Sequence, residues 1–477
     1  MESESESCTV TLGEQQERAV ALIKQNKNLF LTGCAGTGKS AVIEHIRNSP
    51  TWNPETHRIT ASTGVAALLV GRGEGSTLHS FLGWDFKETN VRRCVEEIKR
   101  KTNKYKELCS VRLLIIDEIS MIQSQYFYTA GEVLKQVRGN TRPWGGIQLV
   151  VVGDFFQLPP VKDPHKLFNT EAWKSCDFTV CILEKVYRQA SDMEYCDLLR
   201  RVRNGSPTDS DIALLTSRTI QPPPGDVQPT IIVTHKRECD AINRQHFDAL
   251  PDAPTFFPTI AGCSTPHDPE STTYLEKACE RLADDARLPT PDVVCLKRGC
   301  QIMLTVNWEG RANGSRGVVT GFTALTDTDL PVMKVKPERF KKCQINLEHI
   351  PIEARPPMYP IIRWADGGTS VVTEYLWSRT LRSSPHRYRI WVTGVPLLHA
   401  FSTTIHKSQG ATLECCHINM QRNCFSPGQL YVALSRVKSL DSLYITMDMH
   451  QRSIRDSLIT DPEVKQYLTS VRLSELR

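Results

Sequence analysis

The sequence predicts an α/β protein with two parallel-sheet cores, a small insert in the first core and a β-rich, barrel-like insert in the second. The first reason is a series of short apolar runs separated by helical stretches, because strands that are apolar along their whole length are typical of a parallel sheet covered on both faces. These runs are NLFLT (28–32), RITAST (58–63), VRLLIID (111–117), IQLVVVGD (147–154), FTVCILE (178–184), PTIIVTH (229–235) and SLYITMD (442–448). The second reason is a change between about 293 and 390, where short strands and turns such as CQIMLTV, GVVTGF and YPIIRWADGG follow one another.

Breaks in composition divide the chain further. QPPPGD interrupts the α/β pattern near Gln221, and seven prolines fall between 250 and 291. The expected organisation is therefore a polar tail (1–11), a first core (12–178) with a small insert at about 84–110, the first part of a second core (179–249), a Pro-rich connector (250–292), the β-rich insert (293–390) and the second part of the second core (391–477).

Composition excludes several classes of protein. Lys and Arg number 58 against 53 Asp and Glu, a net charge of +5 that neither requires nor excludes a nucleic-acid partner. No apolar run approaches the ~18 residues of a membrane span, and the start, MESESESC, has neither an apolar signal core nor an Arg-rich amphipathic segment. The 16 cysteines include no CxxC pair, so reduced thiols are expected. We therefore expect a chain that is neither secreted nor in a membrane, located in the nucleus or otherwise in the cytoplasm.

The segment from Gly33 to Ser40 matches the phosphate-loop pattern GxxxxGK[ST] at every position. An apolar strand precedes it and a helix is expected over 40–47, which is the context that the motif requires. Glycines let backbone N–H groups curl around phosphates, the helix N-terminus adds positive charge, Lys39 supplies a cation to the β- and γ-phosphates, and Ser40 offers a hydroxyl to Mg²⁺. The expected nucleotide ligands are Gly33, Cys34, Ala35, Gly36, Thr37, Gly38, Lys39 and Ser40.

An acidic pair, Asp117 and Glu118, stands at the end of the run VRLLIID. A carboxylate at the C-terminal end of a parallel strand lies beside the phosphate loop in such sheets. We expect Asp117 to hold Mg²⁺ together with Ser40, and Glu118 to polarise the attacking water. Acidic pairs usually cap helices or face solvent, but the buried strand and the complete phosphate loop favour the catalytic interpretation. The chain is therefore expected to be a nucleoside triphosphatase.

Eight further segments follow one another in an order typical of one family. They are ASTGVAALLV (61–70), GSTLHSFLG (75–83), IIDEISMI (115–122), RPWGGIQLVVVGDFFQLPPV (142–161), LEKVYRQ (183–189), NGSRGVV (313–319), TIHKSQGATL (404–413) and GQLYVALSRVKSL (428–440). Together they resemble the Pif-type (petite integration frequency) DNA helicases, the RecD-related branch of helicase superfamily one, over about 12–448 with 250–291 unmatched. The resemblance implies two RecA-like phosphate-loop cores and an ATP-driven motor that moves 5′ to 3′ on single-stranded DNA and unwinds the duplex ahead.

The resemblance also implies roles at the nucleotide. Gln16 in LGEQQ resembles the family's adenine-reading glutamine, since a side-chain amide can donate and accept at once. Gln157 resembles the γ-phosphate sensor, while Arg188 and Arg436 resemble two arginines that reach the γ-phosphate from the second core. Tyr187 stands where the family often has Phe, and no chemical consequence is expected of this difference.

Two groups of residues resemble the family's DNA-binding motifs. They are Thr63, Gly64, Thr77, His79, Ser80 and Phe81 in the first core, and Thr404, His406, Lys407, Ser408 and Gln409 in the second. Hydroxyls and backbone amides can hold phosphates without reading sequence, and the second group is expected to link the DNA grip to the nucleotide. A metal-ligand interpretation of the histidines is disfavoured, since no partner stands at ligand spacing. Phe81 and Trp84 are open to two interpretations, as base-stacking platforms or as packed core residues.

Residues 85–110 make up the small insert, which the family uses as a wedge. Eight Lys or Arg against five Asp or Glu give this stretch a charge of +3. A basic face there would guide the junction at which strands separate. A solvated helix with Glu–Lys pairs four residues apart is an equally good interpretation.

The expected function is that of an ATP-dependent DNA helicase in replication, recombination, repair or telomere and genome maintenance, with ATP and magnesium as cofactors. The expected partners are single-stranded and forked DNA, with RNA as an alternative because base stacking does not distinguish the sugar, and the chain is expected to be a monomer. A competing hypothesis is a DNA-stimulated NTPase that acts as a clamp or switch without processive unwinding. An inactive binder is disfavoured because the catalytic set is complete, namely Lys39, Asp117, Glu118, Gln157, Arg188 and Arg436.

Overall fold

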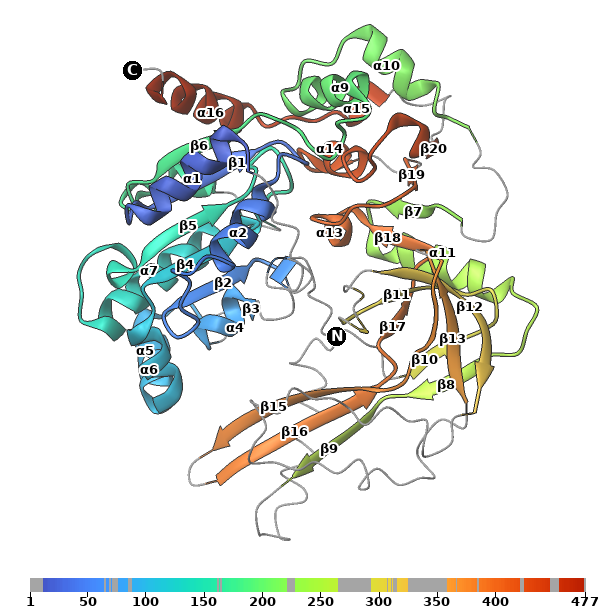
Figure 1. Cartoon of the computed structure of the whole chain (residues 1–477), viewed down its shortest axis with the longest axis horizontal. Coiled ribbons are helices and arrows are strands. Elements are labelled where there is room, and N and C mark those ends of the chain that lie inside the picture. Colours follow the sequence, from blue (N-terminus) through green and yellow to red (C-terminus); the bar gives the residue numbers. More distant parts are fainter. Residues whose placement is uncertain are drawn as a thin grey trace, which may run out of the picture. The chain divides into compact units, whose positions relative to one another are not determined.

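The computed structural model describes most of the chain, and its elements are drawn in Figure 1. The described residues are 12–63, 66–67, 70, 76–84, 88–160, 163, 165–220, 228–264, 293–306, 308–309, 311, 315–324, 358–365, 367–383, 386–420, 424–446 and 454–475. The expected nucleic-acid residue Gly64 lies outside them. The chain divides into two compact units, one made of Met1–Pro222, Pro229–Cys239 and Thr403–Arg477, the other of Pro223–Gln228 and Asp240–Ser402.

The first unit contains two sheets, of which the first has six strands. Their spatial order is β3 (Ser76–Thr77), β2 (His57–Ala61), β4 (Leu113–Asp117), β5 (Gln148–Val152), β1 (Leu29–Gly33) and β6 (Thr179–Leu183). Every neighbouring pair is parallel, which confirms the predicted parallel sheet. Because β6 pairs with β1 along its whole length, this sheet extends to Leu183, beyond the boundary expected at 178.

Helices cover both faces of this sheet (Figure 1). Successive residues of a strand point to opposite faces, so that on β4 Leu114 belongs to one buried cluster and Leu113 to another. The cluster of Leu114, called here the first cluster, includes the apolar side of α7 (Ser124–Arg138). The other cluster includes the apolar sides of α1 (Glu14–Lys24) and α2 (Lys39–Arg47). Burial on both faces explains why the strands are apolar throughout.

The small insert consists of two helices, α5 (Val91–Arg100) and α6 (Thr102–Ser110). Its apolar side chains are buried in the first cluster, namely Cys94, Val95, Ile98 and Leu108. Its charged side chains form pairs three or four residues apart, namely Arg92–Glu96, Lys101–Glu97 and Lys104–Glu107. These pairs are the ones that the solvated-helix interpretation expects, and the wedge role stays a prediction.

The second sheet of this unit has the order β18 (Ser402–Thr404), β7 (Thr230–Val233), β19 (Cys416–Asn419) and β20 (Leu443–Thr446). β19 is parallel to both β7 and β20. Its buried cluster is shared with the helices α9 (Met193–Arg203), α10 (Asp209–Thr216) and α14 (Gln429–Leu434). The expected second α/β core is therefore confirmed.

The helix α16 (Pro462–Glu475) follows the second sheet in sequence but packs against the first core. Its Leu468 is buried in the first cluster. The Tyr467 ring stacks on Phe168 with 4.4 Å between ring centroids, and the Trp173 indole N–H donates to the Tyr467 hydroxyl at 3.2 Å. This helix therefore fastens the two cores of the unit to each other. Neither α16 nor any other described helix is long and apolar enough to cross a membrane.

The second unit consists largely of antiparallel β structure, which confirms the predicted β-rich insert. A five-stranded sheet has the order β14 (Thr369–Val371), β13 (Tyr359–Trp364), β12 (Arg316–Thr323), β11 (Gln301–Leu304) and β17 (Leu397–His399). Further pairings join β15 (Tyr375–Ser383), β16 (His386–Gly394) and β9 (Ile260–Ser264), and also β8 (Thr255–Pro258) and β10 (Val293–Leu296).

The β structure starts earlier than the expected boundary at 293. Both β8 and β9 lie in the stretch that was expected to be a Pro-rich connector. Pro258 ends β8, which pairs with β10 alone in the described part of the chain. Proline is tolerated at strand ends and on edge strands because no ladder hydrogen bond is lost there. The prolines therefore did not exclude strands from this stretch.

Candidate nucleotide site

The phosphate loop joins the end of β1 to the start of α2, as its motif predicts. Gly38 caps α2 with a φ of 79°, a left-handed conformation that favours glycine. A Cβ added to Gly36 would come within 2.7 Å of the Arg188 Cβ, so the loop lies very close to the segment after β6. The half-buried Lys39 ammonium donates hydrogen bonds of 2.7 and 2.8 Å to the carbonyls of the first two loop residues. The lysine is thus held within the loop.

Gln16 lies against this loop and is buried. Its amide N–H donates to the Gly38 carbonyl at 3.3 Å, and its amide oxygen accepts from the Gly13 N–H at 2.8 Å. The same oxygen accepts from the Tyr187 hydroxyl at 3.4 Å. The Tyr187 hydroxyl, which a Phe would lack, therefore lies beside the glutamine amide, whereas no consequence was expected of this difference.

The two carboxylates stand at the end of β4, beside the loop. Asp117 is the last residue of the strand, and its carboxylate accepts from the Glu118 N–H at 2.9 Å. Glu118 has a φ of 53°, a left-handed conformation that is uncommon outside glycine and clusters at functional sites. Burial raises the pKa of Asp117 to about 7, the Glu118 carboxylate adds to this effect, and Lys39 opposes it. Burial lowers the pKa of Lys39, which the carboxylates Asp154 and Glu118 oppose.

The residues expected to hold magnesium suit that ion. Ser40 is in the first turn of α2, and its hydroxyl is an oxygen donor. Asp117 provides a carboxylate whose charge is disfavoured by burial, and a divalent cation would stabilise that charge. Oxygen ligands of this kind, together with phosphate oxygens, are the ones Mg²⁺ uses in nucleotide sites.

Three side chains from outside the first sheet lie near the Glu118 carboxylate. The Gln409 amide donates to the Glu118 carboxylate at 2.8 Å. Arg436 is 1% exposed and donates to carbonyls of its own core at 2.7 to 3.2 Å. Arg188 donates to the carbonyl of Ser435, the residue before Arg436, at 3.2 Å. Burial lowers the pKa of Arg436 to about 10, Arg188 lowers it further and Glu118 opposes the shift. Both arginines and the carboxylate therefore share one neighbourhood, as expected.

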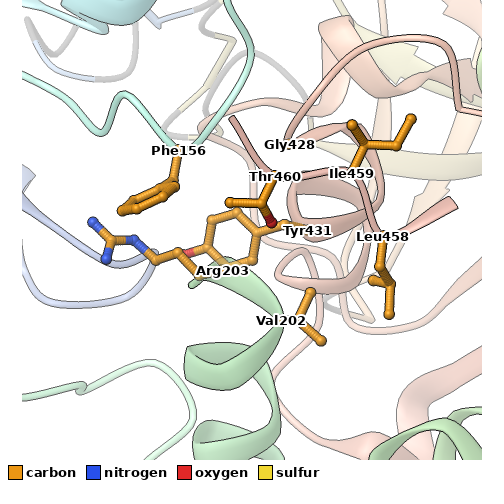
Figure 2. Close-up of a pocket in the computed structure, with 8 residues that line it drawn as sticks. All are labelled: Phe156, Val202, Arg203, Gly428, Tyr431, Leu458, Ile459 and Thr460. Atoms are coloured by element: carbon orange, nitrogen blue, oxygen red, sulfur yellow. The ribbon is translucent and has the colours of Figure 1, made fainter. Parts of the chain in front are cut away.

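A buried ion pair joins the loop after β5 to α9. Arg203 donates to the two carboxylate oxygens of Asp154 at 2.9 and 2.8 Å, and the two side chains are 7% and 0% exposed. The guanidinium lies 4.4 Å from the centre of the Phe156 ring. Burial alone would lower the pKa of Arg203, but the Asp154 carboxylate outweighs it and raises that pKa. Figure 2 shows Arg203, Phe156 and Tyr431 around a cavity of about 10 Å³, which is near the limit for one water molecule.

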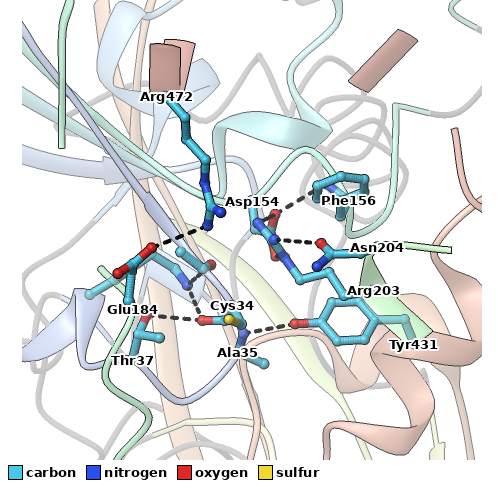
Figure 3. Close-up of polar contacts among 12 residues, drawn as sticks. Cys34, Ala35, Thr37, Asp154, Phe156, Glu184, Arg203, Asn204, Tyr431 and Arg472 are labelled. Carbon is cyan, nitrogen blue, oxygen red and sulfur yellow. Dashed lines mark hydrogen bonds and ion pairs between the residues drawn. The ribbon is translucent and has the colours of Figure 1, made fainter. Parts of the chain in front are cut away.

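α14 contacts the first core at two points. The Ala35 N–H in the phosphate loop donates to the Tyr431 hydroxyl at 2.9 Å (Figure 3). Gly428, which caps α14 with a φ of 77°, lies so close to the first core that an added Cβ would be 2.3 Å from the Phe156 carbonyl oxygen. The next residue, Gln157, is 5% exposed. The phosphate loop and the loop of the expected γ-phosphate sensor therefore both rest on this helix.

Known proteins share this arrangement. A family model described as PIF1-like helicase matches residues 11–212. A mouse relative named ATP-dependent DNA helicase PIF1 is 33% identical over 443 residues, which cover 91% of this chain and 60% of the mouse protein. A relative named ATP-dependent DNA helicase Pif1 from Psychrobacter sp. (strain PRwf-1) is 31% identical over 92% of this chain and 69% of its own length. The chain belongs to the PIF1-like helicase family.

A solved structure supports the same assignment. The crystal structure of the Pif1 helicase from Candida albicans has a TM-score of 0.77 and 29% identity, and the match covers 97% of this chain and 100% of that one. The predicted fold, with two RecA-like cores, is thereby confirmed. This chain spans less than two thirds of the mouse relative's length.

In this PIF1-like helicase the expected DNA-binding residues differ in exposure. Ser80 and Lys407 are exposed, while those half-buried are Thr63, Thr77, His79 and His406. Those that are buried are Phe81, Thr404, Ser408 and Gln409. The hydroxyls of Thr77 and Thr404 accept backbone N–H groups at the starts of the short helices α4 (Leu78–Leu82) and α13 (Ile405–Ser408), and so they shape these motifs.

Two of the buried members, Phe81 and Gln409, have partners within the protein. Phe81 is 3% exposed and packs with Trp84 in the first cluster, which is the arrangement that the packing interpretation expects of both rings, and a base contact by Phe81 stays a prediction. The Gln409 amide donates to the Glu118 carboxylate, so this residue forms the nucleotide side of the motif that is expected to link DNA to nucleotide. His79 packs against the Tyr126 ring, with 4.3 Å between centroids.

Sequence reasoning missed two residues of this site in the PIF1-like helicase. Tyr431 lies within YVALSR, but that motif drew attention only to its arginine, Arg436. Arg203 lies in an Arg-rich helix end, LLRRVR, where it cannot be told from its exposed neighbours by sequence. Its partner Asp154 ends the apolar run IQLVVVGD (147–154) and was given no role.

Proposed function

We propose that this chain is an ATP-dependent DNA helicase that moves 5′ to 3′ along single-stranded DNA and unwinds duplex DNA. The observation that carries the proposal is the hydrogen bond from Gln409 to Glu118. The motif TIHKSQG presents an exposed Lys407 on one side and holds the expected general base on the other. One short segment thus provides a path from a bound strand to the hydrolytic carboxylate. The relatives' names, which describe ATP-dependent DNA helicases, agree with this function.

Each residue of the nucleotide site has a role in this proposal. The amides of the phosphate loop and Lys39 bind the phosphates, and Gln16 reads the adenine once it leaves the Gly38 carbonyl. Ser40 and Asp117 hold magnesium, which supplies charge to the phosphate oxygens. Glu118 accepts the proton of the attacking water, and Gln157 senses the γ-phosphate. Arg188 and Arg436 stabilise the charge that develops in the transition state.

The coupling of DNA binding to ATP hydrolysis follows from the position of the general base, Glu118. In the described conformation Glu118 is held by the Gln409 amide, which competes with an attacking water for the carboxylate. A strand bound at Lys407 would shift the short helix α13 and with it Gln409. We infer that DNA thereby sets the position of Glu118, so that hydrolysis is fast on DNA and slow without it. The other contacts of the strand are proposed to be Thr63, Thr77, His79, Ser80, Thr404 and His406.

The biological role follows from the same proposal. The substrates would be single-stranded and forked DNA, and the processes would be replication, recombination, repair or telomere maintenance in the nucleus. We propose that the chain acts as a monomer, with Mg²⁺–ATP as its fuel.

The test is an unwinding assay on forked duplexes that carry a single 5′ or 3′ tail. We expect displacement with the 5′ tail and ATP, none with the variant Lys39→Ala, and normal displacement with the exposed control Lys24→Ala. DNA-stimulated hydrolysis without displacement on either fork would favour the clamp or switch. Stimulation by RNA in preference to DNA would reassign the substrate, and equal hydrolysis with and without nucleic acid would refute the proposal.

A further inference from the structure

Tyr431 reaches from the second core into the phosphate loop. Its side chain is 4% exposed, and its hydroxyl accepts the Ala35 N–H at 2.9 Å across 396 residues of sequence (Figure 3). None of the expected site roles includes this residue. A buried hydroxyl in contact with a phosphate-binding loop is placed to meet the ligand of that loop.

The hydroxyl of Tyr431 can still donate a hydrogen bond. A phenol can accept hydrogen bonds and also donate one. Within the described part of the chain its hydrogen bond is the one it accepts from Ala35, so its own proton remains for a further acceptor. Burial raises the pKa of Tyr431, with the Asp154 carboxylate adding to the shift, so the hydroxyl stays protonated and remains a donor.

The surroundings of this hydroxyl would suit a phosphate group. Tyr431 is near enough to Arg188 and to Arg436 to influence the pKa of each guanidinium. These arginines are the two groups proposed to meet the γ-phosphate, and Arg188 also packs against the loop at Gly36. An anion held between the loop and the two arginines would therefore lie within the neighbourhood of the hydroxyl proton.

We propose that Tyr431 donates its hydroxyl proton to an oxygen of the terminal phosphate of a bound nucleoside triphosphate, and so distinguishes triphosphate from diphosphate. This inference rests on the proposed function, since it assigns a further residue to the same nucleotide site. Tyr431 precedes Arg436 by little more than one helical turn, and Arg436 is tied to the intervening Val432 carbonyl at 2.7 Å. A phosphate that holds the hydroxyl therefore also holds the helix that positions the arginine.

The test compares the binding of two nucleotides to Tyr431→Phe, which removes the hydroxyl and keeps the ring. A hydrogen bond to a charged acceptor corresponds to a factor of roughly 10 to 100 in affinity. We expect a non-hydrolysable ATP analogue to bind weaker by this factor, measured by calorimetry on the whole chain with magnesium. ADP affinity should stay within about twofold, because ADP lacks the phosphate concerned.

The matched control is Tyr195→Phe. Tyr195 is also buried, and its hydroxyl donates to the carbonyl of Leu434 in the same helix α14 at 2.6 Å, away from the phosphate loop. This control should leave the ratio of the two affinities unchanged even if it lowers stability. Equal losses for ADP and the analogue in Tyr431→Phe, or no loss for either, would overturn the inference. A wild-type chain that hydrolyses no ATP would instead refute the proposed function, because the affinity ratio needs no hydrolysis.

Discussion

The Asp154–Arg203 pair offers the sharpest test of how the two cores are joined. The variant Arg203→Met keeps most of the aliphatic length of the side chain and removes the guanidinium. It leaves the Asp154 carboxylate, which is fully buried, without its cationic partner. The expected result is a large loss of stability in the transition that separates or unfolds the cores.

The magnitude follows from burial. Both partners are almost inaccessible, at 7% and 0% exposure, and the two bonds are 2.9 and 2.8 Å long, so solvent screening does not reduce the effect. Removing one partner of such a pair costs about 3–5 kcal/mol, mainly because the other charge stays buried and unpaired. With an m-value of about 2.5 kcal/mol per M in urea, the midpoint should fall by roughly 1–2 M.

Urea denaturation followed by tryptophan fluorescence measures this change. The control Arg200→Met removes an arginine from the same helix whose partner is Asp197, with both side chains about half exposed, and such pairs are worth about 0–1 kcal/mol. The double variant Asp154→Asn with Arg203→Met should recover part of the loss, because no charge is then left buried. If Arg203→Met denatured like Arg200→Met, the pair would not be buried in solution and the reasoning would be refuted.

Three further predictions concern catalysis. Gln409→Ala should raise the DNA-free rate of ATP hydrolysis by roughly tenfold or more, and so reduce the stimulation by DNA, while ATP affinity stays constant, because the bond that holds the charged Glu118 is lost; an ATPase titration with single-stranded DNA checks this, and an unaltered DNA-free rate would remove Gln409 from the coupling path. Arg436→Ala should lower the maximal rate by on the order of 10³ or more and also the melting temperature, since the buried guanidinium holds several carbonyls of its core; wild-type turnover would contradict its role. Because the pKa of Asp117 is raised from 3.8 to about 7, its charged form prevails only above that pH. ATPase at limiting magnesium should therefore rise as pH increases through about 7, and saturating magnesium should move the midpoint to lower pH; a midpoint that ignores magnesium would argue against Asp117 as a ligand.

The parallel sheets could be predicted because the property that causes them lies within short segments of the sequence. A strand buried on both faces needs apolar residues at every position, and runs such as LLIID show this without any knowledge of the fold. The phosphate loop is equally local, since one strand, eight residues and one helix complete it. Glu118 was expected from its position at the end of a buried strand, whereas Gln16, Gln157, Arg188 and Arg436 were expected from the family resemblance.

The remainder depends on contacts between distant segments. Tyr431 and Ala35, whose hydroxyl and N–H form a hydrogen bond, are 396 residues apart in the sequence, and no short sequence motif predicts such a pair. Phe81 illustrates a second difficulty. The sequence of a DNA-binding motif is the same whether its aromatic ring faces a base or the core. The strand β8 was missed because its proline was interpreted as part of a connector. The sequence does not show that this strand lies on an edge, where proline is tolerated.

The position of α16 has a consequence for how the polypeptide folds as it is synthesised. Trp173 and Tyr467, which close the aromatic side of the first core, are 294 residues apart. At about 5–20 residues per second the ribosome needs roughly 15–60 s to traverse that distance. During this interval the rings of Phe168 and Trp173 lack their cover, so the nascent first core presents apolar surface to the cell. A chain of this design therefore gains from chaperones that bind early, and slow translation of its later half would prolong the exposure.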